Sequence, residues 1–109
     1  MKRLICAALA ATISGVSSAG FVDGNLLQKR AKDDGDIDFA YAIGYVVGVA
    51  DMGDGEEFCL PVNFSAGQAL DIAKNFLQKY PDLRHYNAAL LVSASLKQKF
   101  PCQKKGTGL

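Results

Sequence analysis

The sequence predicts a small all-α fold, a four-helix bundle with one disulfide that closes the C-terminal αα-hairpin. Apolar residues recur at helical spacing in separate segments, and no segment alternates apolar and polar residues as a half-buried strand does. Cys59 and Cys102 stand just before and just after the last two helical segments, which a turn at Pro81 separates. No internal repeat or long linker divides the chain, so we expect one domain.

The first 19 residues have the features of a secretory signal peptide. Lys2 and Arg3 precede an apolar stretch over residues 4–16, which is shorter than the ~20 residues that a membrane-spanning helix needs. The small residues Ser17, Ser18 and Ala19 then form a signal peptidase site. We therefore expect a cleaved signal peptide over residues 1–19, a helical domain over 20–102 and a flexible basic tail over 103–109. A membrane anchor or amphipathic helix is the less favoured alternative.

Export leaves two cysteines in the mature chain, Cys59 and Cys102. An even pair in an exported protein predicts a disulfide. Closing a loop of this size stabilises the fold by roughly 4 kcal/mol in the chain-entropy model. A metal site is disfavoured because the chain has a single histidine, His85, and no cofactor is expected.

The charge balance argues against nucleic acid and anionic membranes as main partners. Without Lys2 and Arg3, the 12 basic and 11 acidic residues become 10 and 11, a net charge of about −1. The charges are unevenly distributed, since most acidic residues precede Cys59 and most basic residues follow it. The two halves either steady each other by packing or present an acidic face to a partner.

The first two helices differ in pattern. Asp23 is placed to cap a helix that runs to about Lys32, with Leu26 and Leu27 facing inward. The next segment, residues 37–50, is apolar on nearly every face, which is typical of a central buried helix or of one shared with a second subunit. Its two glycines, four residues apart, would let another helix approach closely.

The third helix has the clearest signals of start and end. Ser65 and Gln68 form a capping box, apolar residues follow at helical spacing, and Pro81 disfavours helix at Tyr80. The fourth helix is predicted from about Tyr86 to residue 99, and a Phe-Pro pair ends it.

The sequence does not indicate an enzyme. His85 would have to serve every histidine-dependent mechanism, and the two cysteines are expected to be bonded to each other. The acidic residues cluster in hydrophilic loops, where raised pKa values are not expected, and the loop over residues 51–57 does not match an EF-hand. A small exported helical domain of this kind is typically a binding protein.

Two turns near the disulfide-closed hairpin are candidate contact surfaces, because a preorganised turn loses little entropy on binding. One is the acidic loop before Cys59, and the other is the turn after Pro81. For Arg84 and Tyr86, simple packing of the turn is an equally good interpretation. The candidate partner-binding residues are Asp54, Glu56, Glu57, Asp82, Arg84, His85 and Tyr86.

Six short motifs occur in an order and at a spacing that resemble the Tai-type immunity proteins of type VI secretion systems, over about residues 39–102. Each motif is weak alone, and the six in register are fairly specific. The motifs are Gly44-Tyr45-Val46-Val47-Gly48-Val49-Ala50-Asp51, Cys59-Leu60-Pro61, Gln68, Tyr80-Pro81-Asp82-Leu83-Arg84-His85, Ala88-Ala89 and Phe100-Pro101-Cys102.

The resemblance implies a periplasmic all-α protein, usually a homodimer, that blocks the cysteine–histidine active site of a secreted peptidoglycan amidase. The implied mechanism is steric occlusion without turnover. We add the hypothesis that carboxylates of the acidic loop pair with a protonated histidine or basic rim of the target. The residues predicted to serve dimer or helix packing are Tyr41, Gly44, Tyr45 and Gly48.

The chain departs from the pattern at two positions. Relatives often have a second cysteine pair, whereas this sequence has Ala42 before the Gly-Tyr pair and Ala31 in the first helix. The first helix is then expected to be held by packing alone. The runner-up function is a small periplasmic acid-stress chaperone, in which carboxylates that protonate near ~4 would act as sensors. A catalytic periplasmic protein is the third possibility.

Overall fold

The computed structural model describes residues 20–32 and 35–103 and shows an all-α domain. The predicted signal peptide and residues 104–109 of the predicted tail lie outside the described residues. The described helices are α2 (Gly24–Lys32), α3 (Asp36–Gly53), α4 (Ala66–Lys79), the 3-10 helix η1 (Pro81–Leu83) and α5 (Ala88–Lys99). The prediction of four α-helices joined in one bundle is confirmed.

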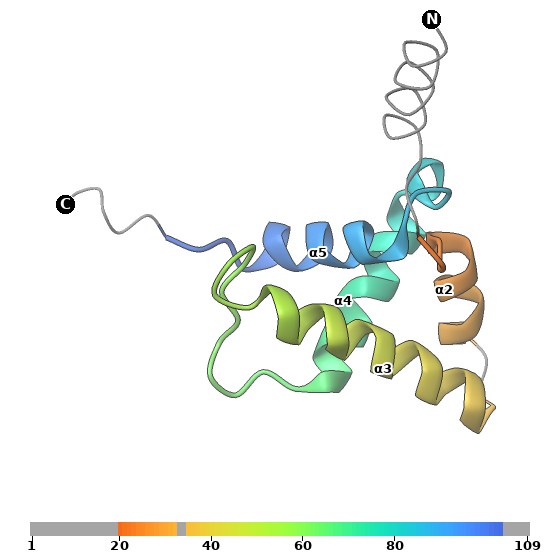
Figure 1. Ribbon diagram of the computed structural model, residues 1–109, viewed down its shortest axis with the longest axis horizontal. Coiled ribbons are helices and arrows are strands. Elements are labelled where there is room, and N and C mark those ends of the chain that lie inside the picture. Colours follow the sequence, from red (N-terminus) through yellow and green to blue (C-terminus); the bar gives the residue numbers. More distant parts are fainter. Residues whose placement is uncertain (1–19, 33–34, 104–109) are drawn as a thin grey trace, which may run out of the picture.

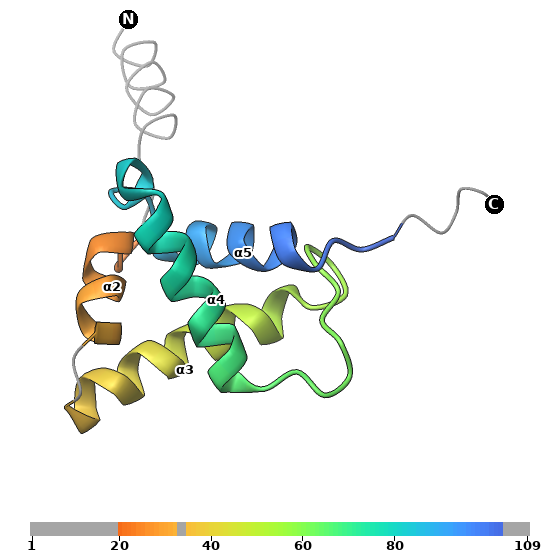
Figure 2. The ribbon, with the colours of Figure 1, turned by 180° about the vertical axis from the view of Figure 1, so that it is seen from behind.

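Helices α3 and α5 lie side by side on one face, and α4 crosses behind them (Figure 1). Seen from behind, α4 lies in front of both, and α2 closes one end of the bundle (Figure 2). The core between them is made largely of small and branched apolar side chains. Its largest fully buried members are Phe58, Leu27, Leu77, Leu96, Val46 and Val92.

The start of α2 is tied to the turn before α5. Leu26 N–H donates to Asp23 Oδ1 at 2.9 Å, so the predicted cap is confirmed. Gly24 N–H donates to the Tyr86 carbonyl at 3.1 Å, and Ala88 N–H donates to the Val22 carbonyl at 2.8 Å. The first N–H groups of both helices, which have no partner inside their own helix, are thereby satisfied across the domain.

Helix α3 is longer and less buried than predicted. It begins at Asp36 and continues to Gly53, three residues beyond the predicted end. Its buried residues are Ala42, Val46, Ala50 and Gly53, and the opposite face is exposed, with Ile37 81% and Met52 84% accessible. Of the two alternatives, the central helix buried on all sides is wrong, because α2, α4 and α5 together cover only part of its surface. A helix shared with a second subunit stays a prediction.

Helices α4 and α5 begin at side-chain caps. The predicted capping box is confirmed, since Gln68 N–H donates to Ser65 Oγ at 3.1 Å and Ser65 N–H donates to Gln68 Oε1 at 2.9 Å. Helix α5 begins at Ala88, two residues later than predicted, because Asn87 has a non-helical backbone and its side chain accepts a hydrogen bond from Ala89 N–H at 2.8 Å.

The predicted disulfide is confirmed between Cys59 and Cys102, whose Cα atoms are 4.9 Å apart. It joins the segment before α4 to the segment after α5. Beside it, Cys59 N–H donates to the Phe100 carbonyl at 2.9 Å, and the rings of Phe64 and Phe100 meet edge to face at 5.1 Å. Three kinds of contact thus hold the ends of the α4–α5 hairpin together.

Candidate functional site

The acidic turn, residues 54–57, follows α3 and has a defined backbone. The N–H groups of Glu56 and Glu57 donate to the Gly53 carbonyl at 2.9 and 2.8 Å. Gly55 has a φ of 87°, a conformation that favours glycine, and its N–H donates to the Phe58 carbonyl at 2.7 Å. The fully buried Phe58 ring anchors the turn, so its two glutamates project from a fixed support.

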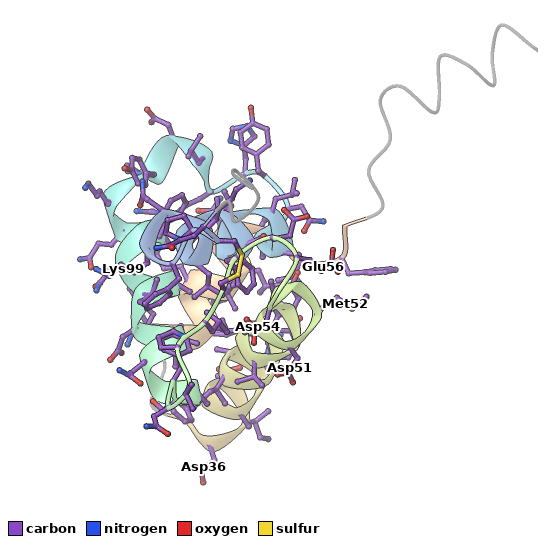
Figure 3. All side chains as sticks on the ribbon, turned by 90° about the vertical axis from the view of Figure 1, so that its left-hand side faces the viewer. Asp36, Asp51, Met52, Asp54, Glu56 and Lys99 are labelled. Carbon is purple, nitrogen blue, oxygen red and sulfur yellow. A yellow bond between two sulfur atoms is a disulfide. The ribbon has the colours of Figure 1, made fainter. Side chains whose placement is uncertain are left out.

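The three acidic residues of this turn differ in role. Asp54 accepts a hydrogen bond from Leu60 N–H at 2.9 Å, so it organises the next loop. Glu56 and Glu57 are exposed, and within residues 20–32 and 35–103 neither forms an ion pair. Figure 3 shows Asp51, Met52 and Glu56 on one side of the molecule and Lys99 on the other. Glu56 and Glu57 are therefore available to a partner.

Loop 59–65 is a surface that the sequence analysis missed. It is held by the disulfide at its start and by the capping box and Phe64 at its end, and Phe64 N–H donates to the Pro61 carbonyl at 3.2 Å. Between these supports, Val62 is 95% exposed. The sequence does contain a signal for this surface, namely an apolar residue in a proline-containing turn directly after a bonded cysteine.

A groove of about 610 Å³ lies between α3 and α5. Gly44, Gly48 and Met52 line one side, Ala89 and Ser93 the other. A Cβ added at either glycine would meet nothing within 4 Å outside the backbone of its own helix. The two glycines are thus not needed for packing inside the described domain, and their exposed backbone is open to close approach.

Tyr45 and Tyr41, the other two residues predicted for dimer packing, have separate surroundings. Tyr45 lines the groove, and partial burial raises the pKa of its hydroxyl, although a hydrogen bond with the Ala89 backbone offsets part of this effect. The Arg30 guanidinium lies over the Tyr41 ring, 4.3 Å from its centroid, and pairs with Asp38 at 2.8 Å. All four predicted packing residues therefore lie on α3, outside its buried face.

The second predicted turn is at the other end of the molecule. In both ribbon views, residues 81–87 lie near α2, and the acidic turn and loop 59–65 lie at the far ends of α3 and α5 (Figures 1 and 2). Asp82 is exposed. His85 and Tyr86 are also exposed, and the centroids of their rings are 4.1 Å apart. Arg84 is partly buried and its Nε donates to the Leu77 carbonyl at 2.7 Å, so it packs the turn. The two turns do not form one continuous surface.

Neither a metal centre nor a membrane span is found in the part of the chain that the structure describes. No group of three or more His, Cys, Asp or Glu side chains there is placed to hold a metal ion. The described helices include none that is long and apolar enough to cross a bilayer. The buried Ser95 hydroxyl is occupied within its own helix, because its Oγ donates to the Val92 carbonyl at 2.7 Å.

Comparison with known proteins assigns this chain to a family. A model of the Rap1a immunity proteins matches residues 5–102, most of the chain. The chain belongs to the Rap1a immunity protein family. No curated protein matches it closely enough to be counted as a relative.

Membership of the Rap1a family makes the chain an immunity protein, one whose partner is a cognate secreted effector. The family also favours a non-enzymatic inhibitor over the chaperone and the catalytic protein considered above. In this Rap1a protein the rigid, exposed features are the acidic turn, loop 59–65 and the α3/α5 groove. The acidic turn and the groove meet at the end of α3, since Glu56 and Glu57 also line the groove, and loop 59–65 is joined to the turn by the hydrogen bond from Leu60 N–H to Asp54.

Proposed function

We propose that this Rap1a protein acts in the periplasm, where it binds a peptidoglycan amidase delivered by a type VI secretion system and blocks its active site. The observation that carries the proposal is the match to the immunity family, taken with a rigid acidic and apolar projection at one end of the bundle. The leader features of residues 1–19 support export. The Tai-type motifs support an amidase as the target.

Occlusion by this surface needs no catalytic group. Val62 projects from a loop that is closed at both ends, so inserting it into a cleft costs little ordering entropy. Glu56 and Glu57 project from the anchored acidic turn that precedes this loop, where they meet a basic rim or a protonated histidine of the target. Opposite charges at such a rim speed association and select the correct partner.

Reversing the charge of the acidic turn tests this surface. We expect Glu56→Lys combined with Glu57→Lys to weaken the complex with the amidase encoded beside this protein by about tenfold or more, mainly through slower association at low salt. The fold should be unaffected, because both side chains are exposed. Surface plasmon resonance at two salt concentrations measures the rates.

Asp71→Lys is the control, since Asp71 is an exposed acid on α4 away from the turn. Equal loss of affinity in this variant and in the double variant would refute a specific role for the acidic turn. Failure of the wild-type protein to bind any neighbouring hydrolase, or survival of cells that lack it when the amidase reaches their periplasm, would refute the function itself.

We further propose that the protein is a homodimer that pairs through the α3/α5 groove. The exposed face of α3 carries Ile37, Tyr41 and Met52, and the open glycines beside them allow a helix of the second copy to approach closely. Burying these side chains would remove apolar surface from water. Glu56 and Glu57, at one end of the groove, remain at its rim.

A substitution at Gly48 separates dimer formation from folding. Gly48→Glu should leave the helix intact, because the site is open and glutamate has the higher helix propensity, yet it should place a bulky charge in the interface. We expect the wild-type protein to be a dimer and this variant a monomer by light scattering. Gly67→Glu on α4 is the control, and a wild-type monomer would contradict the proposal.

A further inference from the structure

A basic cleft of about 340 Å³ lies between α2 and the C-terminal half of α4, away from the acidic turn, loop 59–65 and the α3/α5 groove. Each helix contributes one amide and one ammonium group four residues apart, and Arg84 closes the end. The lining residues are Gln28, Lys32, Lys74, Gln78 and Arg84. Residues four apart lie on the same side of a helix, so both walls present donors to the cleft.

Arg84 is held in place from three directions. Its N–H donates to the Pro81 carbonyl at 3.3 Å, and its carbonyl accepts from Asn25 N–H at 3.0 Å. The side-chain Nε donates to the Leu77 carbonyl at 2.7 Å. Within the described residues the two terminal guanidinium nitrogens make no hydrogen bond, and these are the groups that bind a carboxylate in the two-point manner.

The cleft holds more basic side chains than the stabilisation of its helix ends would explain. Basic residues stabilise the last turn of a helix by interacting with its partial negative charge. Lys32 occupies such a position on α2, but Lys74 lies five residues before the end of α4. Within the described part of the chain, the lining includes no acidic residue and neither lysine forms an ion pair. Asp33 and Asp34, which follow Lys32, lie outside the described residues.

The donor set favours a carboxylate on a peptide over a phosphate. Phosphate sites commonly use the free N–H groups at a helix N-terminus. The N–H groups at the start of α2, beside Arg84, already donate to the Tyr86 and Arg84 carbonyls and to Asp23 Oδ1. Gln28 and Gln78 offer both a donor and an acceptor, which match the N–H and carbonyl of a peptide bond. The two lysines and Arg84 then complement a carboxylate beside it.

We propose that this cleft binds the carboxylate of a short peptide, of the kind carried by the stem peptides of the cell wall. The carboxylate site follows from the cleft itself, and the choice of the cell wall as its source rests on the proposed periplasmic function. Because the cleft and the acidic turn lie at opposite ends of the molecule, a wall-bound protein would keep its effector-binding surface free (Figure 2).

The test is an NMR titration of the mature, oxidised protein with a soluble muropeptide whose stem carboxylates are free. We expect saturable shifts at Lys32, Lys74 and Arg84, and roughly threefold to fivefold weaker binding by Lys74→Gln, the effect of losing one exposed ionic contact. Lys97→Gln is the matched control, because Lys97 is an exposed lysine on α5 outside the cleft. Its affinity should equal that of the wild-type protein.

Three further ligands test the chemical class of the bound group and its source. Equal binding of the muropeptide with amidated carboxylates, or no saturable shift at the cleft, would overturn the site. Tighter binding of inorganic phosphate would overturn the assignment to a carboxylate. Tighter binding of a linear L-peptide of equal charge would overturn the cell wall as the source. These titrations contain no effector, so their failure leaves the proposed immunity function standing, and loss of effector binding would not alter their result.

Discussion

Replacing Cys59 and Cys102 with serine is expected to lower the free energy of unfolding by about 4 kcal/mol. The two residues are 43 positions apart, so the disulfide removes much of the chain entropy of the unfolded state. A small domain has only ~5–15 kcal/mol in total, and the loss is therefore a large part of its stability. Urea denaturation of the oxidised wild-type protein and of the double variant measures the difference.

The same substitution should also weaken effector binding, because loop 59–65 loses its support at Cys59 and Val62 must then be ordered on binding. Val62→Ala is the comparison variant for stability. Because the Val62 side chain is 95% exposed, this substitution should change the free energy of unfolding by no more than about 0.5 kcal/mol. Unfolding of the double variant at the wild-type urea concentration would contradict the assigned role of the disulfide.

Phe58→Ala is expected to cost about 3–5 kcal/mol, the range observed when a buried aromatic ring is deleted. The ring is fully buried, and a Cβ added at Gly53 would lie only 2.6 Å from its Cζ, so it packs directly on the end of α3. Because this ring anchors the acidic turn, the variant should bind the effector more weakly even where it remains folded. Urea denaturation and binding rates test the two effects.

Phe21→Ala is the matched control, since it deletes the same side chain at a position that is 95% exposed. Its free energy of unfolding should stay within about 0.5 kcal/mol of the wild-type value. If both phenylalanine variants lose the same stability, the ring of Phe58 does not have the anchoring role described here.

The two alanines that depart from the family pattern, Ala31 and Ala42, lie in the core of the domain. Ala31 in α2 and Ala42 in α3 are both buried, with 5% and 0% of their surface exposed, and both belong to the same apolar core. Two buried alanines therefore occupy the positions at which the resemblance to the Tai-type proteins implies a second cysteine pair. The expectation that packing alone holds the first helix is wrong. Within the described residues, the Arg30–Asp38 ion pair and the backbone hydrogen bonds to residues 84–88 also hold α2 to the domain.

The sequence by itself determined the parts of this protein that depend on near neighbours in the chain. The capping box of Ser65 and Gln68, the stop at Pro81 and the cap at Asp23 each act over three or four residues, so the pattern located their helices. The disulfide was predictable because removal of the predicted signal peptide leaves one pair of cysteines. The family motifs indicated an immunity protein, which the family match supports.

Only the tertiary structure decided which surfaces are exposed. Helix α3 is apolar on nearly every side, so its sequence has no polar face from which to tell the buried side from the exposed one. The exposure of Val62, the groove beside Gly44 and Gly48, and the separation of the two predicted turns depend on contacts between residues far apart in the chain. Burial is a property of packing, and local periodicity cannot specify it where every residue is apolar.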